Sequence, residues 1–291
     1  MTLQLDAWLD AVREGVALAS TAADPFAHVL VLASTASTND DVARAAAEGA
    51  PEGYTVIAAE QTAGRGRRGA VWHSPAAHGL YCSMLLRPPR WPSVLADAAS
   101  AAPALATLMA GVAVARAVHD VRGAAVELKW PNDVMVRDGV SGWRKLAGIL
   151  AEGASDGGGL RTIVLGVGVN VHRSSAPPEI ASRMIALEDL TPARSDDGGL
   201  ARGLVAALLA RLRAGVMRLS RGAVSEVRAE WAALAPSVQG TPVEWQTPAG
   251  LRRGIASGID DDGALRVTTA EGPVERLHGG DVIWALDGAC A

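Results

Sequence analysis

The segment Gly64-Arg65-Gly66-Arg67-Arg68-Gly69 combines three glycines with three arginines, a composition that suits an anion-binding loop. Glycines let the backbone come close to a ligand and adopt positive φ angles. Guanidinium groups donate paired hydrogen bonds to carboxylates and phosphates. Gln61 precedes the loop and Trp72 follows it, so a polar side chain and a large flat ring flank the cations. We therefore expect a loop that is mobile when empty and closes over an anionic ligand.

The same glycines satisfy the G-x-G-x-x-G pattern of dinucleotide-binding proteins, which makes a nicotinamide-dependent oxidoreductase an alternative. That pattern requires a helix directly after the glycines, whose N-terminus receives the pyrophosphate. Here the chain continues with Ala70-Val71-Trp72-His73-Ser74-Pro75, which indicates a loop. An acidic residue is also expected about 20 positions further on, where the chain has Arg87-Pro88-Pro89-Arg90. The sequence context therefore disfavours the oxidoreductase, and a solvated basic turn is the other alternative to a ligand loop.

Further cations and amides stand at the ends of expected strands. Lys129-Trp130-Pro131-Asn132-Asp133 places a lysine, an amide and a carboxylate around a bend stiffened by proline, and such groups contact nucleotides, phosphate or Mg²⁺. Lys145 begins the next apolar run. Two glycines interrupt the strand Gly166-Val167-Gly168-Val169-Asn170, which indicates close approach of a backbone or a ligand. Taken singly, each feature also fits an ordinary turn or a solvated strand end.

Other common chemistries lack their motifs. The histidines His73, His78 and His172 do not have the spacing of a zinc site. The chain contains neither a G-x-S-x-G nucleophile elbow nor a P-loop. These other chemistries are therefore poorly supported by the sequence.

Taken together, the motifs resemble those of biotin–protein ligases over residues 28–171. The segments that carry the resemblance are Ser37-Thr38-Asn39, Glu60-Gln61-Thr62-Ala63-Gly64-Arg65-Gly66-Arg67-Arg68-Gly69, Trp72, Lys129-Trp130-Pro131-Asn132-Asp133, Lys145-Leu146-Ala147-Gly148-Ile149-Leu150 and Gly166-Val167-Gly168-Val169-Asn170. The resemblance implies that Mg·ATP activates biotin to biotinyl-5′-AMP. The biotinyl group would then pass to a lysine of a biotin carboxyl carrier protein domain of an acyl-CoA or pyruvate carboxylase. A ligase for lipoate or another short acid is the nearest alternative.

The resemblance also implies roles for individual residues. Those expected to bind biotin are Ser37, Thr38, Asn39, Gln61, Arg65, Gly66, Arg67 and Lys145. Those expected to bind ATP or the adenylate are Arg67, Arg68, Trp72, Lys129, Asn132 and Asn170. Arg65, Arg67 and Lys145 are the catalytic candidates, because cations placed before the reaction let two anions meet. Asp133 is the candidate Mg²⁺ ligand.

For the elements that position these residues, the resemblance implies an α+β fold, a mixed sheet with helices followed by an SH3-like β-barrel. Hydrophobic patterning places strands near 28–32, 54–59, 80–86, 126–130, 133–136, 145–152 and 162–171. It places helices near 6–20, 40–48 and 97–119 and two more within 199–235. Residues 137–144 contain Gly139 and Gly142, so we expect Lys145 to be loosely placed without ligand.

The residue pattern changes after Pro236. Five short apolar runs separated by turn signals follow Val238, which indicates a small β-barrel. We therefore expect a catalytic domain over 1–236 and a C-terminal domain over 237–291.

Composition limits the partners and the compartment. The formal net charge of −4 gives no electrostatic reason to expect nucleic-acid binding. About 27 residues precede the first expected strand, so we expect the winged-helix domain of some relatives to be absent. The uncharged stretch 98–115 is rich in alanine and glycine, which favours a buried helix over a membrane span. With no signal peptide and two distant cysteines, Cys82 and Cys290, a reduced cytoplasmic protein is expected. The resemblance implies a monomer or a homodimer.

Overall fold

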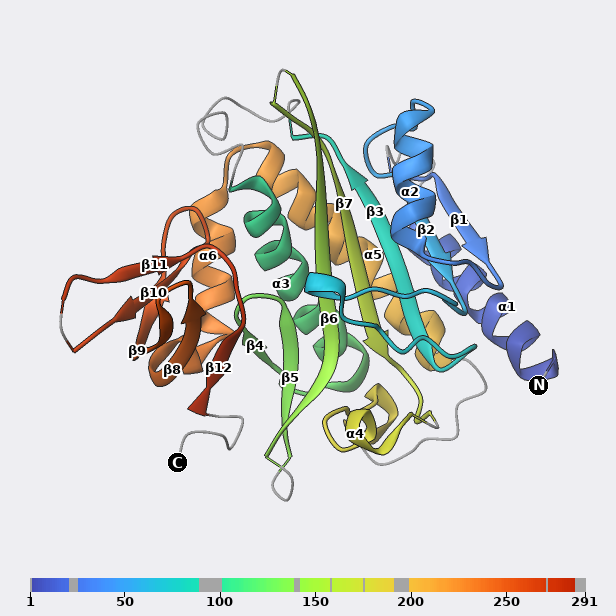
Figure 1. The fold of residues 1–291 in the computed structure, drawn as a ribbon. Helices are drawn as coiled ribbons and strands as arrows, with labels where there is room; N and C mark the ends of the chain where they lie inside the picture. The colour runs from blue at the N-terminus through green and yellow to red at the C-terminus, as the bar shows by residue number, and fades with distance from the viewer. Residues whose placement is uncertain are drawn as a thin grey trace.

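The computed structural model describes residues 2–20, 26–88, 101–138, 142–157, 159–174, 176–190, 199–270 and 272–285. A seven-stranded sheet lies at the centre of the molecule, and a smaller five-stranded sheet lies beside it (Figure 1). Helices pack against the larger sheet, and the predicted α+β class is therefore confirmed.

The larger sheet has the strand order β1-β2-β3-β7-β6-β5-β4. Its strands are β1 (Val29–Leu32), β2 (Thr55–Ala58), β3 (Gly79–Leu86), β4 (Glu127–Lys129), β5 (Asp133–Asp138), β6 (Gly142–Asp156) and β7 (Gly159–Asn170). β1 and β2 pair in parallel and all other neighbours pair antiparallel, so the sheet is mixed as expected. β3 is buried along its whole length, because it lies between β2 and β7 with both of its faces covered.

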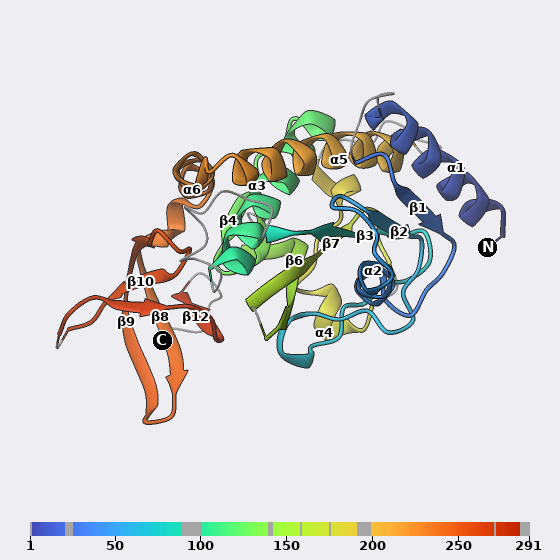
Figure 2. The ribbon, with the colours of Figure 1, turned by 90° about the horizontal axis from the view of Figure 1, so that it is seen from above.

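Helices cover both faces of this sheet. Figure 2 shows α1 (Thr2–Ala19), α3 (Ala102–Arg122) and α5 (Gly199–Ser220) on one side. The other side carries α2 (Thr38–Ala47) and the short α4 (Pro178–Ala181). α3 is long and apolar enough to cross a membrane, but 67% of its most apolar window is buried inside the protein. It is therefore a core helix, as its small residues predict.

The helix α2 begins earlier than the sequence pattern indicates. Ser37 takes the extended N-cap conformation, and Thr38 and Asn39 already lie in the first helical turn. Asp40 and Asp41 also lie in that turn, where carboxylates stabilise the positive end of the helix dipole. The expected start at residue 40 was wrong, because the polar run before it looks like a loop. As a result, Thr38 and Asn39 are held rigidly and are buried.

Lys145 lies inside β6 and not at the start of a strand, which corrects the expectation for this region. β5 and β6 form a hairpin in which Arg137 pairs with Trp143 and Met135 pairs with Lys145. The turn of the hairpin, residues 139–141, lies outside the described residues. The backbone of Lys145 is also bonded on its other side, from its N–H to Arg183 O and from Ile185 N–H to its carbonyl. Ladder bonds on both sides therefore fix the position of this residue in the chain.

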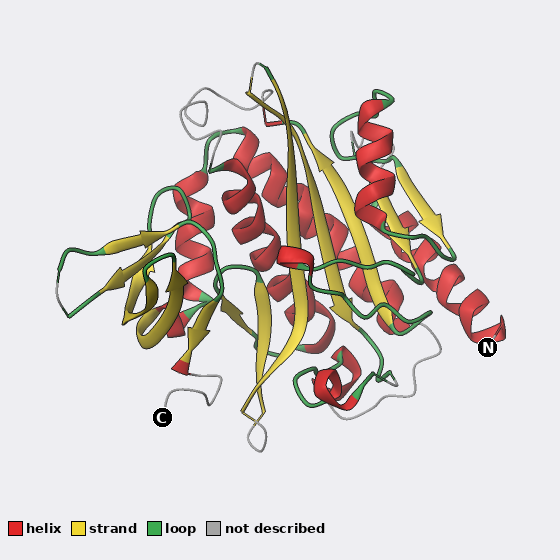
Figure 3. Ribbon diagram, viewed as in Figure 1, coloured by secondary structure: helices red, strands yellow, loops and turns green. Residues whose placement is uncertain are grey.

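The C-terminal sheet has the order β11-β10-β9-β8-β12 and is antiparallel throughout. Its strands are β8 (Gln239–Thr247), β9 (Gly250–Ile259), β10 (Leu265–Thr268), β11 (Glu275–Leu277) and β12 (Val282–Trp284). All five predicted strands are confirmed (Figure 3). The turn before β10 packs on α3, and Gly263 O accepts a hydrogen bond of 2.9 Å from the indole Nε1–H of Trp130. This contact ties the smaller sheet to the bend that carries Asn132.

Two helices lead into that sheet as predicted. α5 ends at Ser220, and α6 (Val224–Ala233) follows and packs beside α3. Sequence patterning gave no elements for residues 172–190, which form α4 and a 3₁₀ turn, Leu187–Leu190. This segment supplies the bonds to Lys145 described above.

Candidate functional site

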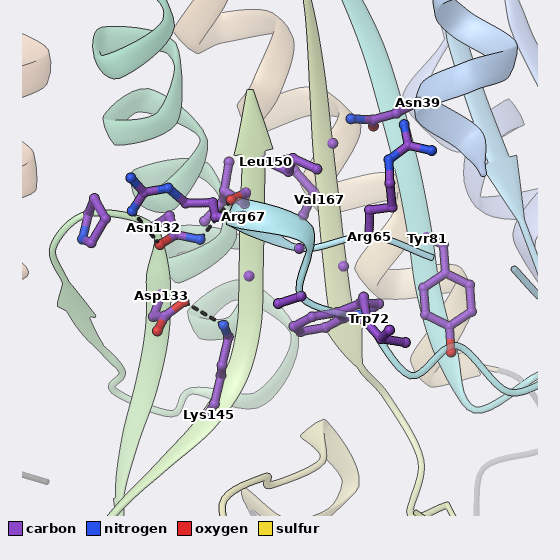
Figure 4. A pocket seen from close by; sticks show the side chains of 18 of the residues that line it. Asn39, Arg65, Arg67, Trp72, Tyr81, Asn132, Asp133, Lys145, Leu150 and Val167 are labelled. Carbon is purple, nitrogen blue, oxygen red and sulfur yellow. Dashed lines mark hydrogen bonds and ion pairs between the residues drawn. The ribbon is translucent and has the colours of Figure 1, made fainter. Parts of the chain in front are cut away.

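A cavity of about 280 Å³ opens on the sheet face that carries α2, beneath the Gly/Arg loop (Figure 4). Its walls come from α2, the loop, the β4–β5 bend, β6, β7 and the turn before β12. Most of the predicted site residues line it: Ser37, Thr38, Asn39, Gln61, Arg65, Gly66, Arg67, Trp72, Lys129, Asn132, Asp133 and Lys145. The fold thus brings together segments more than a hundred residues apart in the sequence.

A fixed network of side chains forms one end of the cavity. The amide oxygen of Gln61 accepts a bond of 2.9 Å from the backbone N–H of Thr38. Its Nε2 donates to Ser74 Oγ at 3.1 Å, and Ser74 in turn donates to the carbonyl of Trp72. These bonds determine which atom of the Gln61 amide faces each neighbour. The polar end of the cavity is therefore organised before any ligand arrives.

A second chain of bonds runs from this end to β6. The hydroxyls of Thr38 and Ser83 lie 2.7 Å apart, and Ser83 Oγ donates to Asn39 Oδ1 at 2.6 Å. Asn39 Nδ2 then donates to Glu152 Oε2 at 2.5 Å. The single proton of the Thr38 hydroxyl is also directed to Gln61 Oε1 at 3.0 Å, so Gln61 and Ser83 share it. Ser83 and Glu152 were not predicted, although Glu152 ends the apolar run that begins at Lys145.

The glycines inside β6 and β7 make room for two of these side chains. A Cβ at Gly166 would lie 2.4 Å from Asn39 Oδ1. Gly148 and Gly168 are cross-strand partners, and a Cβ on either would lie within 2.9 Å of the Trp72 ring. Close approach does occur at these glycines, but the side chains of Asn39 and Trp72 make it and not the backbone or ligand that the sequence led us to expect.

The guanidinium of Arg65 is held by two carboxylates. It forms a two-point pair with Asp40 at 2.7 and 2.6 Å and a longer contact of 3.4 Å with Glu152. The bonds from Arg65 lower the pKa of Asp40, and the bond to Asp40 raises the pKa of Arg65. Arg65 lines the cavity as predicted, but its charge is already compensated, so it anchors the loop to α2. Asp40 was missed because it follows the Ser-Thr-Asn run as an apparent helix cap.

Arg67 is the more available cation of the loop. It is half-buried beside Asn132, whose Oδ1 lies 3.5 Å from its Nη1, and it forms no ion pair with any described residue. Burial lowers its pKa, and the more distant charges of Asp133 and Asp281 act in the opposite direction. A buried guanidinium without a carboxylate partner is well suited to receive an anionic ligand.

Lys145 and Asp133 form the opposite end of the cavity. Lys145 Nζ lies 2.5 Å from Asp133 Oδ1 and 5.2 Å from the centre of the Trp72 ring. Asn132 beside them is oriented by a bond of 2.9 Å from its Nδ2 to Ile149 O. This end therefore presents cations and an amide, whereas the far end presents hydroxyls and an amide.

Two predicted residues lie outside the lining of this cavity. Asn170 is buried at the end of β7, where its Nδ2 donates to Lys145 O at 3.1 Å. In this structure it supports the strand that carries Lys145. Arg68 does not line the cavity; it pairs with Asp281 of the C-terminal turn at 2.8 Å, and both side chains are exposed. That turn, Gly280–Val282, lines the cavity and was not predicted as part of the site.

The residues at the lysine end suit a magnesium–phosphate group. Mg²⁺ is usually held by one or two carboxylates together with water and substrate phosphates. Asp133 supplies one carboxylate and Asn132 an amide oxygen beside it. In the described part of the chain, no cluster of three or more histidine, cysteine or acidic side chains could hold a metal ion alone.

Comparisons with known proteins agree with this site. The profile of the Biotin/lipoate A/B protein ligase family matches residues 31–170, and that of the Biotin protein ligase C terminal domain matches residues 240–284. The biotin–[acetyl-CoA-carboxylase] ligase of Mycobacterium tuberculosis is 36% identical over 87% of this chain and 87% of its own length. The enzyme of the same name from Paracoccus denitrificans is 34% identical, over 81% and 92%.

Solved structures show the same fold. The biotin protein ligase of Aquifex aeolicus in complex with biotin and ATP superimposes with a TM-score of 0.69 at 24% identity. The superposition covers 88% of this chain and 98% of that one. The curated relatives, covered over most of their length at more than 30% identity, show that the chain belongs to the biotin protein ligase family.

Proposed function

We propose that this protein activates biotin with ATP and transfers the biotinyl group to a lysine of a carrier protein. The observation that carries the proposal is that one cavity has a neutral polar end and a cationic end. A ligand with a polar ring at one end and a carboxylate at the other fits this arrangement. The family membership and the names of the relatives support the same activity.

In this proposal the polar end binds the biotin ring. Ser37, Thr38, Asn39 and Gln61 line that end, and three of them are nearly inaccessible to solvent. Because the described hydrogen bonds fix Thr38, Asn39 and Gln61, the ring meets donors and acceptors that are already oriented. Preorganised groups of this kind cost little ordering entropy on binding. Arg65 and Gly66 form the rim, and Arg65 holds the loop against α2.

The cationic end positions the two reacting anions. Arg67 and Lys145 lie on opposite sides of the space in which the biotin carboxylate would meet the α-phosphate. The carboxylate oxygen bonds to the α-phosphorus, and the bond from that phosphorus to the bridging oxygen breaks, releasing pyrophosphate. Cations placed in advance stabilise the charge that develops. Lys129 and Asn132 line the same end and would contact the nucleotide, together with Arg68, Trp72 and Asn170.

The loop then protects the intermediate. A biotinyl-adenylate is a mixed anhydride that water hydrolyses, so exclusion of solvent favours transfer over loss. The carrier lysine attacks the acyl carbon, and AMP leaves with the bridging oxygen. No enzyme nucleophile is needed for either step. Trp72 lies across Gly148 and Gly168 beside Lys145, where it would form part of the cover.

Magnesium would be held at the lysine end. Asp133 is the ligand we propose, with Asn132 beside it, and the ion would neutralise phosphate charge when bound with ATP. Asp133 is paired with Lys145 in this structure, so Lys145 would turn toward the phosphate as the carboxylate takes up its new role. After this rearrangement, Asp133 would bind the magnesium ion and Lys145 would bind the phosphate.

The acceptor we propose is the biotin carboxyl carrier domain of an acyl-CoA or pyruvate carboxylase. The cytoplasm is the compartment, since it supplies ATP. The catalytic unit comprises residues 1–236, and residues 237–291 form the C-terminal unit, which reaches the cavity through Gly280–Val282.

The proposal is tested by mass spectrometry of a carrier domain incubated with the protein, biotin and Mg·ATP. We expect one lysine to gain a biotinyl group, and a Lys145→Ala variant to lose most of that activity. Arg266→Gln, a change at an exposed position of β10 outside the cavity lining, serves as the control. If the carrier domain stays unmodified with biotin but is modified with lipoate, the protein is a lipoate ligase and the proposal is wrong.

A further inference from the structure

Glu152 lies on β6 at the place where the polar end of the cavity meets the Gly/Arg loop. Its Oε2 accepts a bond of 2.5 Å from Asn39 Nδ2 and lies 3.4 Å from Arg65 Nη2. Asn39 belongs to α2 and Arg65 to the loop, and their side chains lie side by side in the lining of the cavity (Figure 4). Glu152 is not among the described residues of that lining. One carboxylate oxygen outside the lining therefore holds two side chains that belong to it.

The orientation of the Asn39 amide depends on this carboxylate. An ionised carboxylate only accepts hydrogen bonds, so the amide must turn its Nδ2 toward Glu152 and not its Oδ1. Ser83 Oγ donates to that Oδ1 at 2.6 Å, which favours the same orientation. The Asn39 side chain is buried, and its Oδ1 lies above Gly166, where a Cβ would come within 2.4 Å. The amide cannot turn over without losing both bonds.

The position of Glu152 depends in turn on Arg65. The Arg65 guanidinium forms a two-point pair with Asp40, which follows Asn39 in the first turn of α2. The bonds from Asn39 through Glu152 and Arg65 to Asp40 therefore begin and end on adjacent residues of one helix. Among the described residues, no hydrogen bond joins Asn39 to Arg65 directly. Glu152 is the link between the polar end and the loop.

We propose that Glu152 is a positioning residue for biotin recognition, which holds the Asn39 amide in the orientation that the ring requires. The proposal rests on the biotin-binding role given to the polar end above. Arg65 contributes to ring binding by holding Glu152 in place, in addition to anchoring the loop. Because Glu152 acts through Asn39 and lies outside the cavity lining, its loss should affect biotin binding and not ATP binding or the chemical step.

The proposal is tested by steady-state kinetics of biotin-dependent exchange of pyrophosphate into ATP. We expect Glu152→Ala to raise the KM for biotin about tenfold, because it leaves the buried Asn39 amide without its acceptor. Glu152→Gln should raise it only about threefold, because the amide oxygen still accepts from Asn39 but no longer pairs with the charge of Arg65. The KM for ATP and kcat should stay within twofold of the unchanged protein. Glu48→Ala, at the exposed C-terminal end of α2, is the matched control.

A double-mutant cycle separates positioning from a general loss of structure. The effects of Asn39→Ala and Arg65→Ala on the KM for biotin should be non-additive while Glu152 is present and additive in the Glu152→Ala background. The same coupling in both backgrounds overturns the proposal, because Glu152 would then not be the link.

Two further results also overturn the proposal. One is a folded Glu152→Ala variant with an unchanged KM for biotin. The other is an equal rise in the KM for ATP, which would indicate a general loosening of the cavity. Absence of biotin-dependent exchange in the unchanged protein would instead contradict the adenylation proposed above.

Discussion

At the scale of single residues, the three arginines of the Gly/Arg loop have different surroundings and so different roles. Arg65 is bound by Asp40 and Glu152, Arg68 is paired on the surface with Asp281, and Arg67 is half-buried with an amide as its polar neighbour. The sequence shows three equivalent cations. Only the structure separates an anchor, a surface pair and an available cation.

Arg67→Ala should preserve folding but weaken retention of the biotinyl-adenylate. The change removes the half-buried cation nearest the reacting end, and a charge-assisted hydrogen bond contributes about 1.5–3 kcal/mol. We therefore expect the intermediate to dissociate roughly tenfold faster or more. The measurement is release of labelled adenylate after rapid dilution, with Arg266→Gln as the control. An Arg67→Ala variant that retains the adenylate normally contradicts the role assigned to Arg67.

Asp40→Ala and Arg65→Ala should have the same phenotype, because each removes one half of the loop anchor. We expect either change to raise the KM for biotin roughly threefold, and the double variant to be no worse than either single one. Arg65 holds the pKa of Asp40 below the usual value of an aspartate, so the pair persists above that usual value and is lost only as the pH falls through the lowered pKa. The interaction between Asp40 and Arg65 should therefore contribute equally to the KM for biotin from pH 6 to pH 8. Additive effects in the double variant would show that the two residues act separately.

At the scale of elements, β6 and β7 form the floor of the site through their paired glycines. A Cβ at Gly168 would lie 2.6 Å from Trp72 Nε1, closer than neighbouring atoms normally approach. The strand pairing that aligns Gly148 with Gly168 thus creates a surface without side chains, on which the Trp72 ring lies. The position of the Trp72 ring depends on this floor.

Gly168→Ala should displace the Trp72 ring and destabilise the protein by about 1–3 kcal/mol, the usual cost of overpacking. Thermal unfolding measures the loss, and adding Trp72→Ala should recover part of it by removing the colliding ring. Gly203→Ala on α5 is the control, because its Cβ would lie 3.6 Å from Val121, an ordinary contact. That variant should be about 0.5–1 kcal/mol more stable, since alanine favours helix. No difference between the two alanine variants would contradict the packing argument.

Much of the element order was predictable because local patterns determine it. The apolar runs of β3 and β7, the five C-terminal strands and the break between α5 and α6 follow from hydrophobic periodicity and turn residues. The predicted start of α2 was wrong and the predicted extent of β6 was too short. In both cases, polar residues that tertiary contacts bury look like loop residues in the sequence. Asp40, Ser83 and Glu152 enter the site through contacts across 25 to 113 residues. Local patterns carry no information on such pairs.

At the scale of the whole molecule, the two sheets are joined by a common core. Leu265, Val267 and Trp284 of the C-terminal sheet belong to the same buried cluster as residues of α3 and β6. The expected domain boundary near residue 236 stays a prediction. Side chains from both sides of this boundary pack in the same core. The Gly280–Val282 turn reaches the cavity from the smaller unit. The site is therefore completed only when both units are in place.

This shared core predicts that both units unfold together. Calorimetry should show a single transition, and Trp130→Phe should lower its midpoint, because Gly263 O loses its buried donor. The expected cost is about 1–3 kcal/mol, the penalty for an unsatisfied buried group. Two separate transitions, with only the smaller one shifted by Trp130→Phe, would show that the C-terminal unit folds independently.

The central claim is that this cavity activates biotin as an adenylate, and exchange of labelled pyrophosphate into ATP tests it most directly. The protein should catalyse exchange when biotin and Mg·ATP are present, with no carrier domain required, because pyrophosphate reverses the first step alone. Exchange should fall sharply in Lys145→Ala and Arg67→Ala and persist in Arg266→Gln. Exchange that depends on lipoate and not on biotin, or no exchange with any short carboxylic acid, would contradict the account.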